Sequence, residues 1–277
     1  MNLKQQLPFM HATVIGSSSN PHYQQWLRLL RSHGRKKSGC FLIEGKREIS
    51  RAIEAKVSIE CLIFHPTAYQ TIQEESTSIL SHFPSYLLSD RLFQKLSVRE
   101  HPDGFLGIAK RIDFSYHPLR WNPRGLYLLV EQLEKPGNLG ALLRSAEATQ
   151  VEALLLADPH VDPFNPNVIR TSQGAVFQVP IYQNTPAFFL QQIQAHSLSL
   201  WATTPHATQV YWDCDFTHGG VLCIGNEAHG LSPLWLTHAT PIQIPMYGKS
   251  ADSLNAAIAG SLCLYEARRQ KALNRKT

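Results

Sequence analysis

The sequence predicts an α/β protein of two domains, and three observations carry this prediction. Short apolar segments alternate with segments whose apolar residues recur at helical spacing, a pattern typical of a mostly parallel sheet covered by helices on both faces. The 277 residues suffice for two cores, and the aperiodic stretch DFSYHPLRWNPR, with two prolines, interrupts the alternation. We therefore expect a tail at 1–19, a small α/β domain at 20–113, a linker at 114–124 and a second domain at 125–277.

The first domain alternates throughout its length. Its predicted strands are CFLIE, IECLIF, SYLLS and GFLGIAKR, and its predicted helices lie at 21–33, 46–55, 67–80 and 90–96. Residues 35–39, which are rich in Arg and Lys, are expected to form a loop between the first helix and the first strand.

The second domain continues the alternation with more strands. They are LYLLV, EALLLA, VPIY, LSLWAT, GVLCI and PIQI, with helices near 138–149, 167–177, 186–196 and 232–238. A last helix is expected to open at Ser253-Leu254-Asn255, capped by Asp252 or Ser253.

Composition excludes several classes of protein. No apolar run is long enough to cross a membrane, and the first residues lack the apolar core of a signal peptide. Five scattered cysteines indicate reduced thiols in the cytoplasm, and neither they nor the thirteen histidines show the spacing of a metal site. The glycine motifs of dinucleotide-binding, phosphate-binding and serine hydrolase sites are also missing from the sequence.

Positive charge is concentrated in the first domain. Residues 1–115 hold fifteen Lys and Arg against ten Asp and Glu, whereas the remaining residues hold eleven of each, which accounts for the net charge of +5. Much of the excess comes from Arg28, Arg31, Arg35, Lys36, Lys37, Lys46, Arg47 and Arg51. Such a cluster favours a polyanionic partner, although a solvated surface remains the alternative.

The last helix is apolar on two sides. Leu254, Ile258, Leu262 and Tyr265 form one face, and the small residues Ala256, Ala259, Gly260 and Cys263 form another. A helix buried on both sides packs on its own sheet and also on a partner, and we expect the small-residue face to admit the partner closely. An ordinary internal core helix is the alternative.

Three short segments follow predicted strands. NLGALLRSA begins at Asn138 after LYLLV, GNEAHGL begins at Gly225 after GVLCI, and SLN begins at Ser253 after PIQI. In this order they resemble the signature motifs of the SpoU-type (TrmH-like) RNA ribose 2′-O-methyltransferases of the SPOUT superfamily. The resemblance covers residues 125–269. The opening pattern, with FLIEGKREI, is similar to the ribosomal-protein-like RNA-binding domain that precedes the catalytic domain in members acting on ribosomal RNA.

The resemblance implies a deep trefoil knot in the second domain, a homodimer formed through the C-terminal helix, and S-adenosylmethionine as cofactor, with no metal. The cofactor-binding positions it implies are Thr203, Ile224, Gly225, Asn226, Gly230, Ile244, Met246, Ser253 and Leu254. The catalytic positions are Asn138, Arg144, Glu227, Ser253 and Asn255, and the RNA-binding positions are Arg35, Lys36, Lys37, Lys46, Arg47 and Arg170. The implied activity is methylation of ribosomal RNA; methylation of transfer RNA, or RNA binding without catalysis, are the alternatives.

Individual roles stay open in the sequence. Asn138 and Ser253 stand where helix caps are common, and Arg144 could be an exposed helix cation. Glu227 could hold Arg144 or organise its own loop. The chain also departs from the family pattern: Lys135 replaces a usual acidic residue, Gln150 a usual glycine, and the loop between Met246 and Ser253 is one residue longer.

Overall fold

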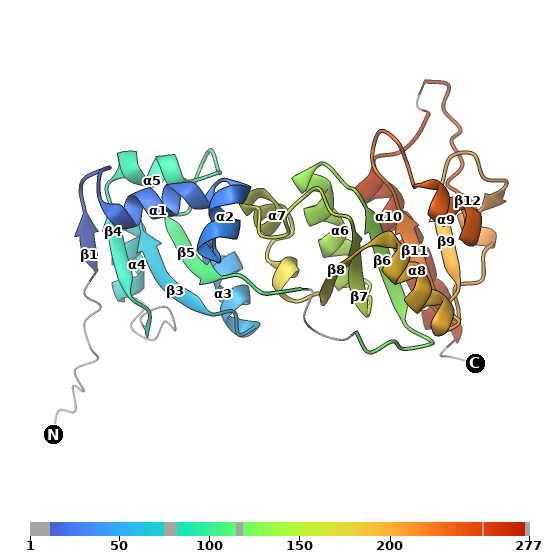
Figure 1. The fold of residues 1–277 in the computed structure, drawn as a ribbon. Coiled ribbons are helices and arrows are strands. Elements are labelled where there is room, and N and C mark those ends of the chain that lie inside the picture. The colour runs from blue at the N-terminus through green and yellow to red at the C-terminus, as the bar shows by residue number, and fades with distance from the viewer. Residues whose placement is uncertain (1–11, 75–81, 115–118, 251, 275–277) are drawn as a thin grey trace. The chain divides into compact units, whose positions relative to one another are not determined.

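The computed structural model of the protein describes residues 12–74, 82–114, 119–250 and 252–274 (Figure 1). The chain forms two compact units, each built around its own sheet. The first comprises the residues up to Ile112 together with Phe164–Arg170, and the second comprises Asp113–Pro163 and the residues from Thr171 onward. The predicted α/β class, with a parallel sheet in the C-terminal part, is confirmed.

The first unit has a mixed five-stranded sheet in the order β1-β4-β3-β5-β2, in which β5 runs antiparallel to both neighbours. Its elements are β1 (Thr13–Ile15), α1 (Pro21–Leu29), α2 (Ser32–Ser38), β2 (Cys40–Glu44), α3 (Lys46–Glu54), β3 (Ile59–Phe64), α4 (Pro66–Glu74), β4 (Ser85–Leu88), α5 (Asp90–Leu96) and β5 (Phe105–Lys110). Apolar residues of α1 and α5 share one buried cluster with one face of the sheet. Ile49 of α3 lies against Gly107 on the other face.

Three expectations for this unit are wrong. The helix predicted at 21–33 ends at Leu29. Residues 13–15, placed in the N-terminal tail, form the edge strand β1, which pairs with β4. The basic stretch predicted as a loop is helix α2, which ends at Gly39 in the left-handed conformation (φ 68°). Its Arg35 side chain is buried and donates to the carbonyl oxygens of Leu29 and Leu30, at 2.9 and 3.2 Å. These hydrogen bonds satisfy carbonyl oxygens at the end of α1 that have no partner within the helix, and they require α2 to fold back.

Residues 164–170 pack with the first unit, although the sequence order places them in the second domain. Helix α7 (Pro166–Thr171) begins there, and it ends earlier than the helix predicted at 167–177. Phe164 is fully buried, stacks on Phe41 with ring centroids 4.4 Å apart, and lies under the Arg111 guanidinium at 4.9 Å. This segment is therefore a core element of the first unit.

The second unit has a seven-stranded sheet in the order β10-β12-β9-β11-β6-β7-β8, and every neighbouring pair is parallel. Its elements are β6 (Leu126–Glu131), α6 (Pro136–Ala148), β7 (Ala153–Ala157), β8 (Ile181–Asn184), α8 (Pro186–Ala195), β9 (Leu200–Thr203), β10 (Gln209–Val210), β11 (Gly220–Ile224), α9 (Pro233–His238), β12 (Thr240–Gln243) and α10 (Ala256–Asn274). Short 3₁₀ turns lie at Ala175–Phe177 and Tyr211–Asp213.

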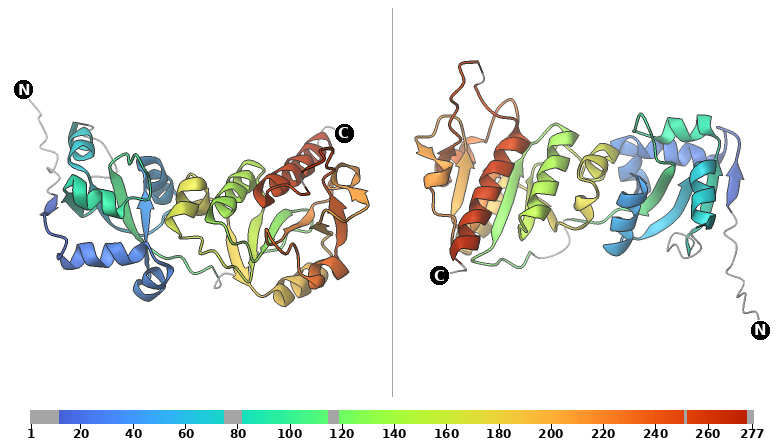
Figure 2. Two further views of the ribbon diagram at one scale, coloured as in Figure 1. Left: turned by 90° about the horizontal axis from the view of Figure 1, so that it is seen from above. Right: turned by 180° about the vertical axis from the view of Figure 1, so that it is seen from behind.

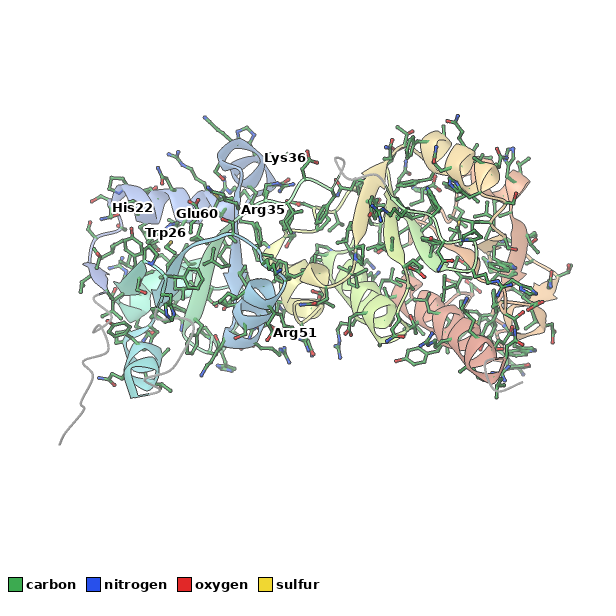
Figure 3. The ribbon with its side chains drawn as sticks, turned by 90° about the horizontal axis from the view of Figure 1, so that it is seen from below. His22, Trp26, Arg35, Lys36, Arg51 and Glu60 are labelled. Atoms are coloured by element: carbon green, nitrogen blue, oxygen red, sulfur yellow. The ribbon has the colours of Figure 1, made fainter. Side chains whose placement is uncertain are left out.

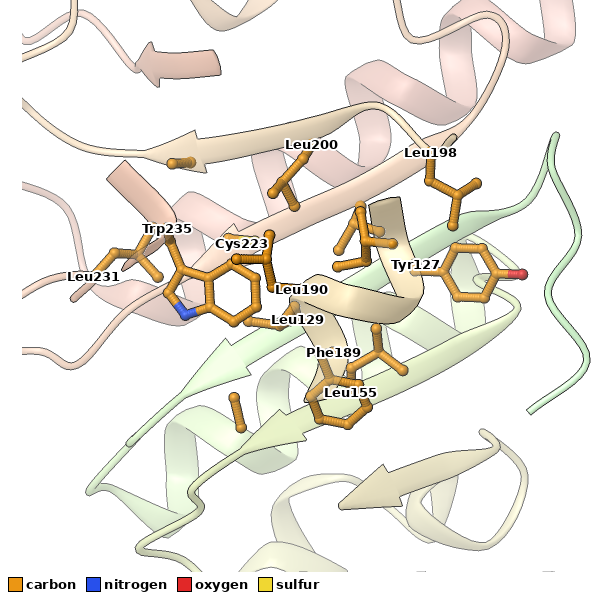
Figure 4. Close-up of a cluster of buried hydrophobic side chains, with 14 of the residues drawn as sticks. Tyr127, Leu129, Leu155, Phe189, Leu190, Leu198, Leu200, Cys223, Leu231 and Trp235 are labelled. Atoms are coloured by element: carbon orange, nitrogen blue, oxygen red, sulfur yellow. The ribbon is translucent and has the colours of Figure 1, made fainter. Parts of the chain in front are cut away.

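Helices cover both faces of this sheet (Figure 2). On one face, α8 and α9 pack on a cluster that includes Leu129, Phe189 and Trp235 (Figure 4). On the other face, α6 and α10 pack against each other and on the sheet. A Cβ added at Gly260 of α10 would lie 2.5 Å from Leu142 of α6, so this glycine permits the close approach.

Helix α10 differs from the expectation in its start and in its faces. Asn255 caps it by accepting from the N–H groups of Ala257 and Ile258, so neither Asp252 nor Ser253 is the cap. Gly260 and Cys263 face the protein's own core, so this part of the small-residue face is not open to a partner. The large apolar residues of α10 that are left exposed are Ile258, Leu262, Tyr265 and Leu273, at 53%, 38%, 55% and 54%.

Candidate functional site at the carboxyl edge of the second sheet

A pocket of about 630 Å³ opens where β9, β11 and β12 end. The carboxyl ends of parallel strands leave backbone groups exposed beside apolar walls, which makes this edge a common place for ligands. All nine positions implied to bind the cofactor line it: Thr203, Ile224, Gly225, Asn226, Gly230, Ile244, Met246, Ser253 and Leu254. Glu227 and Asn255 line it too.

The loop from Gly225 to Leu231 forms the pocket wall after β11. Asn226 and Gly230 exchange two backbone hydrogen bonds, at 3.0 and 2.9 Å, which close the loop. A Cβ at Gly225 would lie 2.2 Å from the Gly230 carbonyl carbon, so only glycine permits this closure. The buried Asn226 amide donates to the Gln132 carbonyl oxygen and to the Glu134 carboxylate, at 2.9 and 3.2 Å. Its side chain is therefore used to join two loops.

Glu227 clamps this loop to the start of α6. One carboxylate oxygen accepts from the Asn138 amide at 2.7 Å and from the Lys135 N–H at 3.3 Å, and the other accepts from the Glu134 N–H at 3.1 Å. Partial burial alone would raise the pKa of Glu227, but these hydrogen bonds outweigh burial and lower the pKa below its ordinary value. Glu227 organises the loop; no contact with Arg144 is found among the described residues.

A chain of hydrogen bonds joins the three motifs. From Glu227 it passes through the Asn138 amide, whose oxygen accepts from the Asn255 amide nitrogen at 3.0 Å. The Asn255 oxygen in turn caps α10. Asn138 lies inside the first turn of α6 and does not cap that helix, whose cap position is Lys135. The sequence therefore brings residues more than a hundred positions apart into one polar cluster.

The structure does not bring Arg144 into this cluster. Its side chain is exposed on α6, makes no hydrogen bond to the described residues, and does not line the pocket. Thr203 directs its hydroxyl to the Cys223 carbonyl oxygen at 2.8 Å, so its side chain joins β9 to β11. Ser253 is exposed at the pocket wall, and no hydrogen bond of its hydroxyl to the described residues is found.

The positions implied to bind RNA have different environments (Figure 3). Lys36 and Lys37 are exposed on α2, and Arg170 is exposed at the end of α7. Arg47 is half exposed and pairs with Glu48 at 2.8 Å, and the Lys46 ammonium lies over the Phe105 ring at 5.8 Å. Arg35 was wrongly placed in this group, because its guanidinium is buried at the end of α1.

Sequence reasoning missed several residues of the pocket. Lys135, His206, Leu231, Leu236 and Ala259 also line it. His206 lies three residues after Thr203, an implied cofactor position, and could have been added on that ground. The position of Leu236 depends on how α9 packs, which no local pattern indicates. Within the described residues, no group of three or more His, Cys, Asp or Glu is placed to hold a metal.

The pattern of the SpoU rRNA Methylase family matches residues 125–265, and that of an MRM3-like substrate binding domain matches residues 20–107. The chain belongs to the SpoU rRNA methylase family. The predicted family and the predicted class of enzyme are thus confirmed.

Similar proteins agree with this assignment. A 23S rRNA (uridine(2479)-2′-O)-methyltransferase of Streptomyces viridochromogenes is 31% identical, over 94% of this chain and 93% of its own. A crystal structure described as an RNA 2′-O ribose methyltransferase has a TM-score of 0.82 at 37% identity and covers 94% of this chain and 100% of its own. The SpoU methyltransferase AviRb from S. viridochromogenes, in complex with the cofactor AdoMet, has a TM-score of 0.81 at 28% identity, covering 91% and 98%.

Proposed function

We propose that this protein transfers a methyl group from S-adenosylmethionine to a ribose 2′-oxygen of ribosomal RNA. The observation that carries the proposal is the pocket at the ends of β9, β11 and β12, where the three family motifs meet in one chain of hydrogen bonds. The relative from S. viridochromogenes, whose name gives 23S rRNA as substrate, supports ribosomal RNA over transfer RNA.

The pocket suits the cofactor in size and in chemistry. Ile224, Ile244, Met246 and Leu254 supply apolar walls, and the Gly225–Gly230 loop supplies backbone groups that can bond an adenine or an amino acid. S-adenosylmethionine, when bound, supplies a methyl group on a positively charged sulfur. The proposed cofactor-binding residues are those nine that line the pocket, with Asn226 and Thr203 acting through the loops they join.

Asn138 and Asn255 are placed to orient a ribose. Each amide nitrogen carries two N–H groups, and each donates one of them within the chain of hydrogen bonds. The second N–H of each is left to meet a ribose oxygen as it gains negative charge, which is the kind of fixed donor that lowers a reaction barrier. Ser253 lies beside them with an exposed hydroxyl. Glu227 fixes the orientation of Asn138.

Arg144 lies outside the pocket of its own chain and contributes to the reaction by binding the RNA. Its exposed guanidinium can bond a phosphate with two parallel N–H groups. We assign it, with Lys36, Lys37, Lys46, Arg47 and Arg170, to binding of the RNA. The five cysteines, all free thiols, support a cytoplasmic location.

The protein is proposed to form a homodimer through α10. Ile258, Leu262 and Tyr265 leave an apolar stripe exposed on this helix, and a second copy can bury it in a two-fold interface. Leu262→Glu should give monomers by light scattering, because it places a charge in that interface. Phe188→Glu, at an exposed residue of α8 on the opposite face of the sheet, should keep the wild-type mass. A Leu262→Glu dimer would contradict this interface.

The activity is tested with labelled S-adenosylmethionine and unmodified transcripts of 23S ribosomal RNA and transfer RNA, followed by mapping of ribose methylation. We expect transfer to the ribosomal RNA, and Asn138→Ala should lower single-turnover transfer about a hundredfold, as for other fixed donors. Gln191→Ala, an exposed amide on α8, is the matched control and should be fully active. Cofactor and RNA binding by the wild type without any transfer would instead support a non-catalytic RNA-binding protein.

A further inference from the structure

Lys135 is the only Lys or Arg among the described residues that line the pocket. Its side chain is exposed, and its main chain is held at the rim from both sides. The Lys135 N–H donates to Glu227 at 3.3 Å, and its carbonyl oxygen accepts from the N–H groups of Asn138 and Leu139, at 3.0 and 3.3 Å. The main chain of Lys135 is therefore fixed, and the ammonium group at the end of its side chain can reach a ligand at the pocket mouth.

Local structure does not explain a lysine here. Lys135 is the cap residue of α6, a helix of 13 residues, and makes no side-chain capping bond. The amino end of a helix carries partial positive charge, so a cation there is unfavourable. No ion pair of the Lys135 ammonium is found within the described residues, and both oxygens of the nearby Glu227 carboxylate already accept N–H groups. A residue that breaks a local rule without a local gain points to function.

We propose that the Lys135 ammonium binds a phosphate adjacent to the ribose that is methylated. The inference rests on the proposed function, which requires a ribose at the pocket mouth. Every ribose within an RNA strand has a phosphate on either side, and an ammonium on a flexible stem binds a phosphate as a point charge. Lys135 thereby positions the substrate strand over the Asn138–Asn255 pair.

The alternative occupant is the carboxylate of the cofactor. The exposed position of Lys135 at the rim favours the RNA, since the strand must cross the rim while the cofactor lies within the walls formed by Gly225, Ile244 and Leu254. A phosphate contact also has a distinctive signature, because it releases a counterion and adds to the salt dependence of RNA binding.

The test compares Lys135→Gln, Lys135→Arg and Arg124→Gln in the full chain. Arg124 is an exposed cation just before β6, at the other end of that strand from Lys135, and serves as the matched control. Binding of a fluorescein-labelled oligouridylate is measured by anisotropy over a series of potassium chloride concentrations, and S-adenosylmethionine binding is measured by calorimetry. Thermal unfolding is recorded for each variant.

The affinity for RNA falls as salt rises, so the slope of log affinity against log salt is negative. We expect Lys135→Gln to make this slope shallower by about 0.7, the value for one phosphate contact to a single strand. Lys135→Arg should restore the slope, Arg124→Gln should leave it unchanged, and cofactor affinity should stay at the wild-type value. The unfolding temperature of Lys135→Gln should not fall, because the helix end loses an opposing charge.

A wild-type slope in Lys135→Gln would overturn the proposal. An equal reduction of the salt dependence in Arg124→Gln would do the same. Weaker cofactor binding with an unchanged slope would overturn it in favour of the cofactor carboxylate. None of these readouts depends on methyl transfer. If the wild type transferred no methyl group, but Lys135→Gln still reduced the salt dependence of RNA binding, the phosphate contact would be supported and the proposed function contradicted.

Discussion

Glu44 and Glu227 lie near the carboxyl ends of strands in the two different sheets, and their environments shift their pKa values in opposite directions. Glu44 ends β2 in the first unit, is almost fully buried, and accepts from the Ser97 hydroxyl and from the Val98 N–H. Burial raises the pKa of Glu44, although these hydrogen bonds oppose it. Glu227 is half-buried, and there the hydrogen bonds outweigh burial and lower the pKa.

The two carboxylates differ in burial, which is nearly complete at Glu44 and only partial at Glu227, and they also differ in their donors. Glu227 faces two main-chain N–H groups and an amide whose oxygen is already bound to Asn255, so none of these groups can turn into an acceptor. Glu44 faces one main-chain N–H and a hydroxyl, and a hydroxyl can rotate to accept. The pocket thus requires an ionised carboxylate, whereas the first unit tolerates a neutral one.

The same substitution at both positions tests this difference, and the larger effect is expected at the pocket. Glu227→Gln replaces one acceptor oxygen by an NH₂ group that faces N–H donors, which leaves donors unpaired. The cost of an unpaired donor, about 1–3 kcal/mol, should weaken S-adenosylmethionine binding about tenfold or more by calorimetry. Wild-type affinity in this variant would mean that the loop at Gly225–Gly230 holds its shape without the clamp.

Glu44→Gln should have a smaller effect, which makes it the matched comparison. Its NH₂ group can donate to the Ser97 oxygen while the hydroxyl turns to donate to the Arg99 carbonyl oxygen, which lies 3.0 Å away. We expect the free energy of unfolding in urea to change by less than about 1 kcal/mol and cofactor affinity not to change. If Glu44→Gln weakened cofactor binding as much as Glu227→Gln, the two carboxylates would not differ as described.

Much of the fold was predictable because apolar patterns are local. Strand β3 and helix α5 have the predicted bounds, since Ile59–Phe64 is apolar except for Glu60 and Asp90 opens a short amphipathic helix. The two-residue strand β10 is too short to give a pattern. Helix α10 was apolar on two sides, so only its packing on Leu142 and Ile224 decides which side is exposed. The knot stays a prediction.

The candidate site was predictable through motif positions, but its contacts were not. The implied cofactor positions all line the pocket because loops after parallel strands end at one edge. The roles of Arg35 and Asn255 depend on partners distant in space or on the exact first residue of a helix, which no periodicity supplies. Arg144 matched its motif, and its side chain nevertheless lies outside the pocket of its own chain.

The smallest expected effect is a pH dependence of opposite sign at the two carboxylates. Glu227 has a folded-state pKa below its ordinary value of about 4.3, so its contribution to stability is present above that value and is lost as the pH falls through the folded pKa. Glu44 has a raised folded-state pKa, so its contribution is present below the ordinary value and is lost as the pH rises through the folded pKa.

Urea unfolding of the wild type and both Gln variants, over a pH series from strongly acidic to neutral, measures these contributions as differences. The wild type should lose stability relative to Glu44→Gln as the pH rises through the raised pKa, because the buried carboxylate becomes charged while the amide does not. Relative to Glu227→Gln, it should lose stability as the pH falls below about 4.3, because protonation removes the acceptor that the Glu134 and Lys135 N–H groups require. Differences of the same sign at both positions would contradict the opposite shifts and would place the two carboxylates in equivalent environments.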